Sequence, residues 1–346
     1  MPAARPRLCQ NGAMESFDPV GWLAGPHAQT LSVAMPRGLP PHAFRKAARP
    51  FTHAVDDERG DEGTLTGVMR WNATASKAPL AILVHGLGGS SESLYVLQAA
   101  HALWERGYHV LCLNLRGAGS SASVAPYPFH AGLTSDLDSV VRAFAGSPGI
   151  ESISLLGFSI GGNVVLKLAG AWGSDVPSAV RGVVSLAAPV DLAAASRNLE
   201  RWQGAFYRHH VLRGLVAAAT RFRLARPERA KYTLRELLPL TSLRAYDRLV
   251  IVPKYGFDDV DDYYAKASAG PELGRVTVPT LLLHADDDPM VPGPDVRTAL
   301  AGASAAIDVR FTARGGHLGW AEGLRGPDLA QRWSTRTLLP WLEERA

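Results

Sequence analysis

Short apolar runs alternate with helical patterns along most of this chain. Seven runs rich in aliphatic and β-branched residues, most of them stopped by Gly, Pro or Asp, predict strands: "LTGVMRWNA" (65–73), "PLAILVHG" (79–86), "HVLCLNLRG" (109–117), "SISLLGFS" (152–159), "RGVVSLAAP" (181–189), "VPTLLLHAD" (278–286) and "AIDVRFTA" (306–313). Three stretches between them have helical periodicity: 91–107, 134–146 and 161–173. Strands that alternate with helices predict an α/β fold with a mostly parallel sheet covered by helices on both faces.

The alternation stops in one long stretch, which divides the predicted domain. From about 191 to 275 the chain becomes helical, aromatic and basic, as expected for a helical lid inserted between two strands of the sheet. We therefore predict one α/β domain over 14–346, with its core at about 61–190 and 276–346. Residues 1–13 are expected to form a disordered leader, and the stretch between this leader and the core is expected to be irregular.

The bulk composition places the chain among globular proteins. Its content of 47% apolar and 20% charged residues is typical of that class. The sequence contains no apolar run of the roughly 18 residues that cross a bilayer, and its start lacks the apolar centre of a secretory signal. We therefore predict a cytoplasmic protein. Cys9 in the polar leader and Cys112 inside a strand pattern make a poor disulfide pair, which fits that compartment.

The charge distribution says more than the net charge. A formal charge of +4 is too small to indicate a nucleic-acid-binding protein, and no motif of that class occurs. Between residues 197 and 236, however, the sequence contains ten Arg or Lys residues and only three Glu residues. This basic lid could make a weak peripheral contact with an anionic membrane. The alternative, which is favoured, is that the helices pack on the core with their arginines in water.

A glycine-flanked serine is the first candidate for chemistry. In "GFSIGG", Ser159 follows a strand pattern and opens a helix pattern, with Gly157 and Gly161 two residues to either side. This is the context of a nucleophile elbow, in which small neighbours let the helix and the strand approach closely. The alternative is an ordinary glycine-rich turn, which the motif taken alone would not exclude.

A serine nucleophile needs a base to take its proton and an acid to orient that base. His317 lies in a glycine turn after the last predicted strand, and Asp288 follows the strand before it. The order Ser159, Asp288, His317 is the order of the α/β-hydrolases. These three residues are therefore the predicted catalytic triad.

Three other aspartates compete for the role of the acid. Asp286 and Asp287 precede Asp288 in "HADDDPMVP" and are interpreted as turn and capping groups. Asp191 follows an earlier strand, but we interpret it as the N-cap of the first lid helix. Asp288 is preferred because the strand-loop-Asp-Pro pattern places it at the carboxyl end of its strand, facing the histidine loop.

The loop "VHGLGGSS" (84–91) follows an early strand and is the candidate oxyanion loop. We assign the oxyanion donors to the backbone N–H groups of Leu87 and Ile160, the residue after the nucleophile. His85 is interpreted as a structural hydrogen-bonding residue. No cofactor or metal is predicted, since "DDVDD" (258–262) lacks the spacing of a calcium loop and fits a turn and helix start.

Eight stretches together resemble one family. They are "WLAGPHAQTL" (22–31), "VHGLGGSSES" (84–93), "LNLRGAGSS" (113–121), "FHAGLTSDL" (129–137), "GFSIGGN" (157–163), "YGFDDVDDYYAKAS" (255–268), "HADDDPMVP" (284–292) and "GGHLGW" (315–320). In these stretches the chain resembles the YheT-type branch of the α/β-hydrolases, relatives of abhydrolase-domain esterases and lipases. The resemblance implies hydrolysis of carboxylic esters by Ser159, Asp288 and His317.

The leading hypothesis is a serine esterase that acts on short- to medium-chain acyl esters through an acyl-enzyme. Its substrate would be a small ester with an apolar acyl group, bound in an apolar pocket beneath the lid. One alternative is an acyltransferase, in which an alcohol replaces water. Another is a catalytically silent ligand-binding protein on the same fold.

Overall fold

The computed structural model describes residues 17–19, 21–35, 40–56, 62–73, 76–322 and 332–346. The predicted leader and Cys9 lie outside these residues. Cys112 is buried in a strand, and burial raises the pKa of its thiol to about 12.

One sheet organises the described part of the chain. Its strands are β1 (Ala48–Asp56), β2 (Glu62–Arg70), β3 (Ala78–Val84), β4 (His109–Leu113), β5 (Ile150–Phe158), β6 (Val180–Leu186), β7 (Thr280–Ala285) and β8 (Ile307–Thr312). Their order in space is β1-β2-β4-β3-β5-β6-β7-β8. The strands from β3 to β8 run parallel, and β1 and β2 join antiparallel at one edge. The seven predicted strands are β2 to β8, so the predicted fold class is confirmed.

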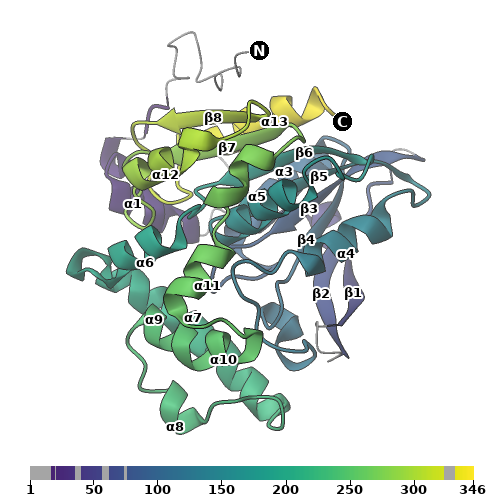
Figure 1. The fold of residues 1–346 in the computed structure, drawn as a ribbon. Coiled ribbons are helices and arrows are strands. Elements are labelled where there is room, and N and C mark those ends of the chain that lie inside the picture. Colours follow the sequence, from purple (N-terminus) through teal and green to yellow (C-terminus); the bar gives the residue numbers. More distant parts are fainter. Residues whose placement is uncertain (1–16, 20, 36–39, 57–61, 74–75, 323–331) are drawn as a thin grey trace.

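Helices connect and cover these strands (Figure 1). The α-helices are α1 (Pro26–Leu31), α2 (His42–Lys46), α3 (Leu94–Glu105), α4 (Ser135–Phe144), α5 (Ile160–Trp172), α6 (Leu192–Glu200), α7 (Ala205–Ala225), α8 (Leu234–Leu237), α9 (Leu243–Tyr246), α10 (Val252–Tyr255), α11 (Val260–Ala267), α12 (Gly293–Ala299) and α13 (Trp333–Glu343). Short 3-10 turns are η1 (Gly21–Leu23), η2 (Ser32–Ala34), η3 (Gly119–Ser123), η4 (Trp202–Gly204), η6 (Gly270–Arg275) and η7 (Leu300–Gly302). The three predicted helices correspond to α3, α4 and α5.

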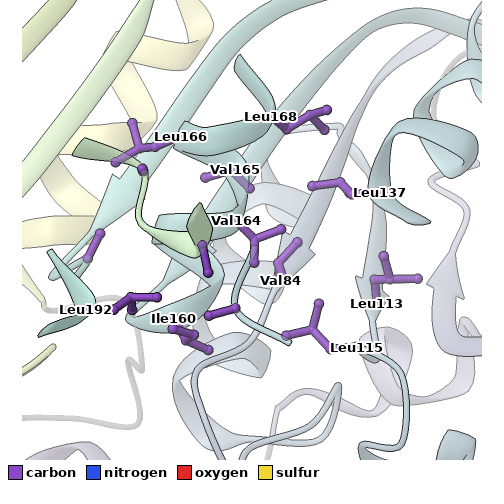
Figure 2. Packing of buried hydrophobic residues seen from close by; sticks show 14 of the residues in the cluster. Val84, Leu113, Leu115, Leu137, Ile160, Val164, Val165, Leu166, Leu168 and Leu192 are labelled. Atoms are coloured by element: carbon purple, nitrogen blue, oxygen red, sulfur yellow. The ribbon is translucent and has the colours of Figure 1, made fainter. Parts of the chain in front are cut away.

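Each face of the sheet has its own apolar core. Alternate residues of β3 show this, since Ile82 belongs to one core and Leu83 to the other. Helices α4, α5 and α12 cover the first face, and α3 and α13 cover the second. Figure 2 shows the first core, where Val84 of β3, Val164 of α5 and Leu137 of α4 contribute side chains to one packed layer. Burial on both faces explains why strands β3 to β7 are almost continuously apolar in sequence.

The start of the core was predicted wrongly. Strand β1 lies before residue 61, within the stretch expected to be irregular, and pairs along its whole length with β2. As the edge strand it is buried mainly at Val55, and most of its other residues are partly or fully exposed. A strand with so little buried surface has no apolar run by which a sequence pattern can reveal it.

Residues between β6 and β7 form the predicted helical insertion, α6 to α11. Figure 1 shows these helices gathered together outside the sheet, in the lower part of the view. Buried side chains of α6 and α7 join the core on the same face as α5. No helix among the described residues combines the length and the apolar character that crossing a bilayer requires.

Candidate active site

Ser159 occupies the single-residue turn between β5 and α5. Its φ of 53° and ψ of −119° lie outside the ordinary regions for a residue with a Cβ, and such a conformation costs on the order of 1 to 3 kcal/mol. The backbone N–H donates to the carbonyl of Leu186 on β6 at 2.8 Å. The turn places the side chain at the carboxyl ends of the parallel strands, the edge at which open α/β sheets bind ligands.

The two flanking glycines allow this turn to be tight. A Cβ on Gly157 would overlap the carbonyl of Gly161, and a Cβ on Gly161 would overlap the carbonyls of Val84 and His85. Both positions therefore exclude any side chain, which is the steric role predicted for the elbow glycines.

Replacing Gly161 with alanine is expected to destabilise the protein by about 3 kcal/mol, the upper range for overpacking a core, because the new methyl group meets rigid backbone. Thermal denaturation would measure this loss. Gly302→Ala is the matched control, since a Cβ there has no heavy atom within 4 Å. Equal melting temperatures for the two variants would contradict this account of the turn.

The structure brings the three predicted triad side chains together. The Nε2 of His317 lies 2.9 Å from the Oγ of Ser159, and its Nδ1 lies 2.7 Å from the Oδ2 of Asp288. An ionised carboxylate can only accept, so Nδ1–H donates to Asp288 and the bare Nε2 accepts from the serine O–H. This tautomer is the one that can take a proton from the hydroxyl.

Both carboxyl oxygens of Asp288 accept hydrogen bonds. Its Oδ1 accepts from the backbone N–H groups of Met290 at 2.8 Å and Val291 at 3.0 Å. Burial alone would raise the pKa of Asp288, but the charge and hydrogen bond of His317, with smaller contributions from His284 and the Val291 amide, lower it overall. The carboxylate therefore stays ionised at neutral pH although it is buried.

The rival aspartates have other partners. Asp191 caps α6 by accepting from the Ala194 N–H at 2.9 Å, so its N-cap interpretation is confirmed. Asp286 forms a bidentate ion pair with Arg297 on α12, and Asp287 accepts from the N–H of Gly316 at 2.8 Å. Both lie in the turn that follows β7, as predicted, but neither caps a helix. Asp287 instead ties the histidine loop to the end of β7.

The candidate oxyanion loop is built around a neutral histidine. His85 is fully buried, its Nδ1–H donates to the carbonyl of Gly86 at 2.8 Å, and its Nε2 accepts from the N–H of Leu115 at 3.2 Å. Burial lowers its pKa to about 4. These contacts confirm the structural interpretation of His85. The hydroxyl of Tyr95 also accepts from the N–H of Gly86 at 2.8 Å.

The two predicted oxyanion donors flank the serine. Leu87 follows the His85-Gly86 turn, and Ile160 is the first residue of α5, where a backbone N–H has no acceptor within its own helix. Neither amide has a hydrogen-bond acceptor among the described residues. Both residues line the same cavity as Ser159. Their role as donors stays a prediction.

Helix α1 supports the histidine loop, a role that sequence reasoning missed. The Oγ1 of Thr30 accepts from the N–H of His317 at 2.9 Å, and the Oε1 of Gln29 accepts from the N–H of Ala321 at 2.8 Å. These bonds join residues that are 287 and 292 positions apart in the chain. The stretch 22–31 was noticed only for its resemblance to the family, because nothing in its local pattern indicates this contact.

An apolar cavity of about 670 Å³ adjoins the serine and the histidine. The helical insertion and its neighbours supply much of its wall, including Leu192, Leu199, Phe206, Val211, Leu215 and Ile251. The predicted apolar pocket beneath the inserted helices is therefore present. The described residues contain no group of three or more His, Cys, Asp or Glu side chains placed to hold a metal ion.

A family described as the alpha/beta hydrolase fold matches residues 79–323. The chain belongs to this family. It is 28% identical to the Escherichia coli K12 protein named "Putative esterase YheT" over 94% of this chain and 92% of that protein, which confirms the predicted resemblance. Phospholipase ABHD3 of Mus musculus is 26% identical over 90% of this chain and 74% of its own.

Solved structures agree with this α/β-hydrolase fold. The esterase Pf2001 of Pyrococcus furiosus superimposes with a TM-score of 0.56 at 14% identity, covering 90% of this chain and 99% of that chain. At such low identity the likeness concerns the fold alone.

Proposed function

We propose that this α/β-hydrolase is a serine esterase that acts on short- to medium-chain acyl esters. The observation that carries the proposal is the hydrogen-bonded chain from Ser159 through His317 to Asp288, which opens on an apolar cavity. Relatives named an esterase and a phospholipase support ester hydrolysis as the type of reaction.

The geometry suggests how the acyl-enzyme forms. The Oγ of Ser159 attacks the ester carbonyl carbon while the Nε2 of His317 takes the hydroxyl proton. The carbonyl oxygen becomes an oxyanion, which the N–H groups of Leu87 and Ile160 hold. His317 then gives its proton to the departing alkoxide, and the acyl group remains on Ser159. Throughout this step the carboxylate of Asp288 stays ionised and stabilises the imidazolium.

Water then hydrolyses the acyl-enzyme by the same sequence of proton transfers. It attacks the acyl carbonyl, its proton passes to the Nε2 of His317, and collapse of the second oxyanion returns that proton to Ser159. The products are a carboxylic acid and a regenerated serine. If an alcohol attacks in place of water, the same steps yield a new ester, which is the acyltransferase alternative.

The proposal can be tested without knowing the natural substrate. Wild-type protein is incubated with a fluorophosphonate, which reacts covalently with activated serines, and its intact mass is measured beside that of Ser159→Ala. We expect one adduct on the wild type and none on the variant. A folded wild-type protein that gains no adduct would overturn the proposal and favour a silent ligand-binding protein.

A weak membrane contact of the inserted helices stays a proposal, and the favoured alternative is that these helices pack on the core with their arginines in water. Trp202 and Phe206 are 83% and 65% exposed, and Phe206 also lines the cavity. Helix α7 has no acidic residue in its 21 positions, which favours contact with an anionic surface.

A further inference from the structure

Part of the cavity wall carries polar groups that the proposed mechanism does not use. Asp247 begins a π-helical segment, η5 (Asp247–Ile251), and Tyr246 precedes it at the end of α9. Both residues line the cavity that also contains Ser159, as does Tyr264 of α11. Single π-helical turns are rare in proteins and frequently occur at functional sites.

Asp247 has one carboxyl oxygen engaged and one available. Its Oδ2 accepts from the hydroxyl of Tyr264 at 2.6 Å, and that hydroxyl in turn accepts from the Oγ of Ser196 at 3.2 Å. Its Oδ1 has no hydrogen-bond partner among the described residues. Arg244 does not supply one, because its guanidinium forms a bidentate pair with Asp261.

The surroundings of Asp247 leave its charge poorly compensated. Burial raises the pKa of this carboxyl to about 7, although the Tyr264 hydrogen bond and the charge of Arg244 act in the opposite direction; the charge of Glu200 raises it further. A group that donates a hydrogen bond to Oδ1 would replace part of the hydration that the carboxylate has lost.

Tyr246 presents a second unsatisfied group in the same wall. It is only 3% exposed, and its hydroxyl makes no hydrogen bond to any described residue. Other tyrosines of the wall have partners for their hydroxyls: His27 for Tyr207, the Ala131 N–H for Tyr263, Asp247 for Tyr264 and the Gly86 N–H for Tyr95. Unlike the enclosed hydroxyl of Tyr108, the Tyr246 hydroxyl is open to the cavity, so it can pair with a group that arrives with the ligand.

We propose that Tyr246 and Asp247 form a subsite that binds a hydroxyl of the substrate. The preferred substrates are then esters that carry a free hydroxyl besides the ester group, such as hydroxyacyl esters or partial esters of polyols. The inference rests on the proposed esterase function and names its substrate class. A hydroxyl can donate to the Oδ1 of Asp247 and accept from Tyr246, whereas a wholly apolar ester leaves both groups unpaired.

Two matched pairs of esters test this subsite. On the acyl side, p-nitrophenyl 8-hydroxyoctanoate is compared with p-nitrophenyl octanoate; on the alcohol side, 1-octanoylglycerol is compared with propyl octanoate. The quantity measured is the ratio of kcat/KM values within each pair. We expect Tyr246→Phe to lower this ratio by roughly three- to tenfold in at least one pair, the effect of one lost hydrogen bond. Its melting temperature should not fall, because no internal hydrogen bond is removed.

A second variant and a control separate binding from folding. In Asp247→Asn the Tyr264 hydroxyl keeps the amide oxygen on its side, so a neutral NH₂ group replaces the carboxylate oxygen that faces the cavity. The substrate hydroxyl then loses a charge-assisted hydrogen bond, and the ratio should fall again. Tyr232→Phe is the control, because this buried hydroxyl donates to the Ala219 carbonyl at 2.9 Å and lies outside the cavity wall. That variant should lose stability with no change in the ratio.

The outcomes distinguish the two proposals. In one outcome the wild-type protein reacts with the fluorophosphonate while Tyr246→Phe and Asp247→Asn leave the kcat/KM ratios unchanged. That result overturns the subsite and leaves the esterase function standing. An equal loss of activity on both members of each pair also overturns the subsite, because it indicates a structural role. Wild-type protein that neither reacts with the probe nor hydrolyses any of the four esters overturns the esterase function itself.

Discussion

Replacing Ser159 with alanine is expected to lower kcat/KM for p-nitrophenyl octanoate by roughly four to six orders of magnitude, the range found when a serine hydrolase loses its nucleophile. The variant lacks the oxygen that attacks the carbonyl, and no other hydroxyl lies within hydrogen-bond distance of the Nε2 of His317 among the described residues. The release of p-nitrophenol measures the loss. Whatever activity remains would come from binding and the oxyanion donors.

The fold should survive this change. The substitution removes the hydrogen bond that the Oγ of Ser159 makes to His317, and alanine keeps the Cβ that the turn already accommodates. Ser152→Ala is the matched control: it makes the same substitution on β5 at a buried hydroxyl that has no hydrogen-bond partner among the described residues. It should retain wild-type turnover. Near-wild-type turnover in Ser159→Ala would refute the proposed nucleophile.

The central strands could be predicted because of where they lie. β3 to β7 are covered on both faces, so their sequences are nearly continuous apolar runs that end near glycine, proline or aspartate. β1 has no such run, since it lies at the edge of the sheet and leaves most of its residues partly or fully exposed. Its pairing with β2 depends on backbone hydrogen bonds, which leave no mark on the pattern of side chains.

The candidate triad of Ser159, His317 and Asp288 could be predicted because each of these residues follows a strand of the parallel sheet. The carboxyl ends of such strands meet at one edge, so their order in the sequence already implies proximity. Choosing among three consecutive aspartates was harder. The structure gives Asp286 and Asp287 partners of their own and turns only Asp288 toward the imidazole.

The residues that hold the loops around this triad in place could not be recognised from the sequence. Thr30 accepts from the backbone of a loop 287 positions away, and Tyr95 accepts from the N–H of Gly86, nine positions before it. The stretch around Thr30 resembles the family, but its local pattern does not indicate this contact. The polar wall formed by Tyr246 and Asp247 was also not predicted. In a basic, aromatic insertion, one tyrosine and one aspartate look like surface residues until the packing shows which side they face.

Asp288→Asn is expected to lower kcat for p-nitrophenyl octanoate by about 10⁴-fold, because the amide would hold the imidazole in the wrong tautomer. The Oδ1 position accepts from two backbone N–H groups, of Met290 and Val291, so the amide oxygen of asparagine settles there. Its NH₂ group then faces the Nδ1 of His317 and requires that nitrogen to accept. The proton moves to Nε2, which can no longer take one from Ser159.

Loss of charge adds to this effect. The imidazolium formed during the reaction would lie beside a neutral amide in a buried site, where a missing counter-charge is costly. Asp286→Asn and Asp191→Asn are the controls, since the first pairs with Arg297 at the surface and the second caps α6. Both should keep turnover within a few-fold of wild type. A larger loss in Asp191→Asn than in Asp288→Asn would show that the acid has been assigned to the wrong strand, because only the residue that orients the imidazole can affect turnover so strongly without unfolding the protein.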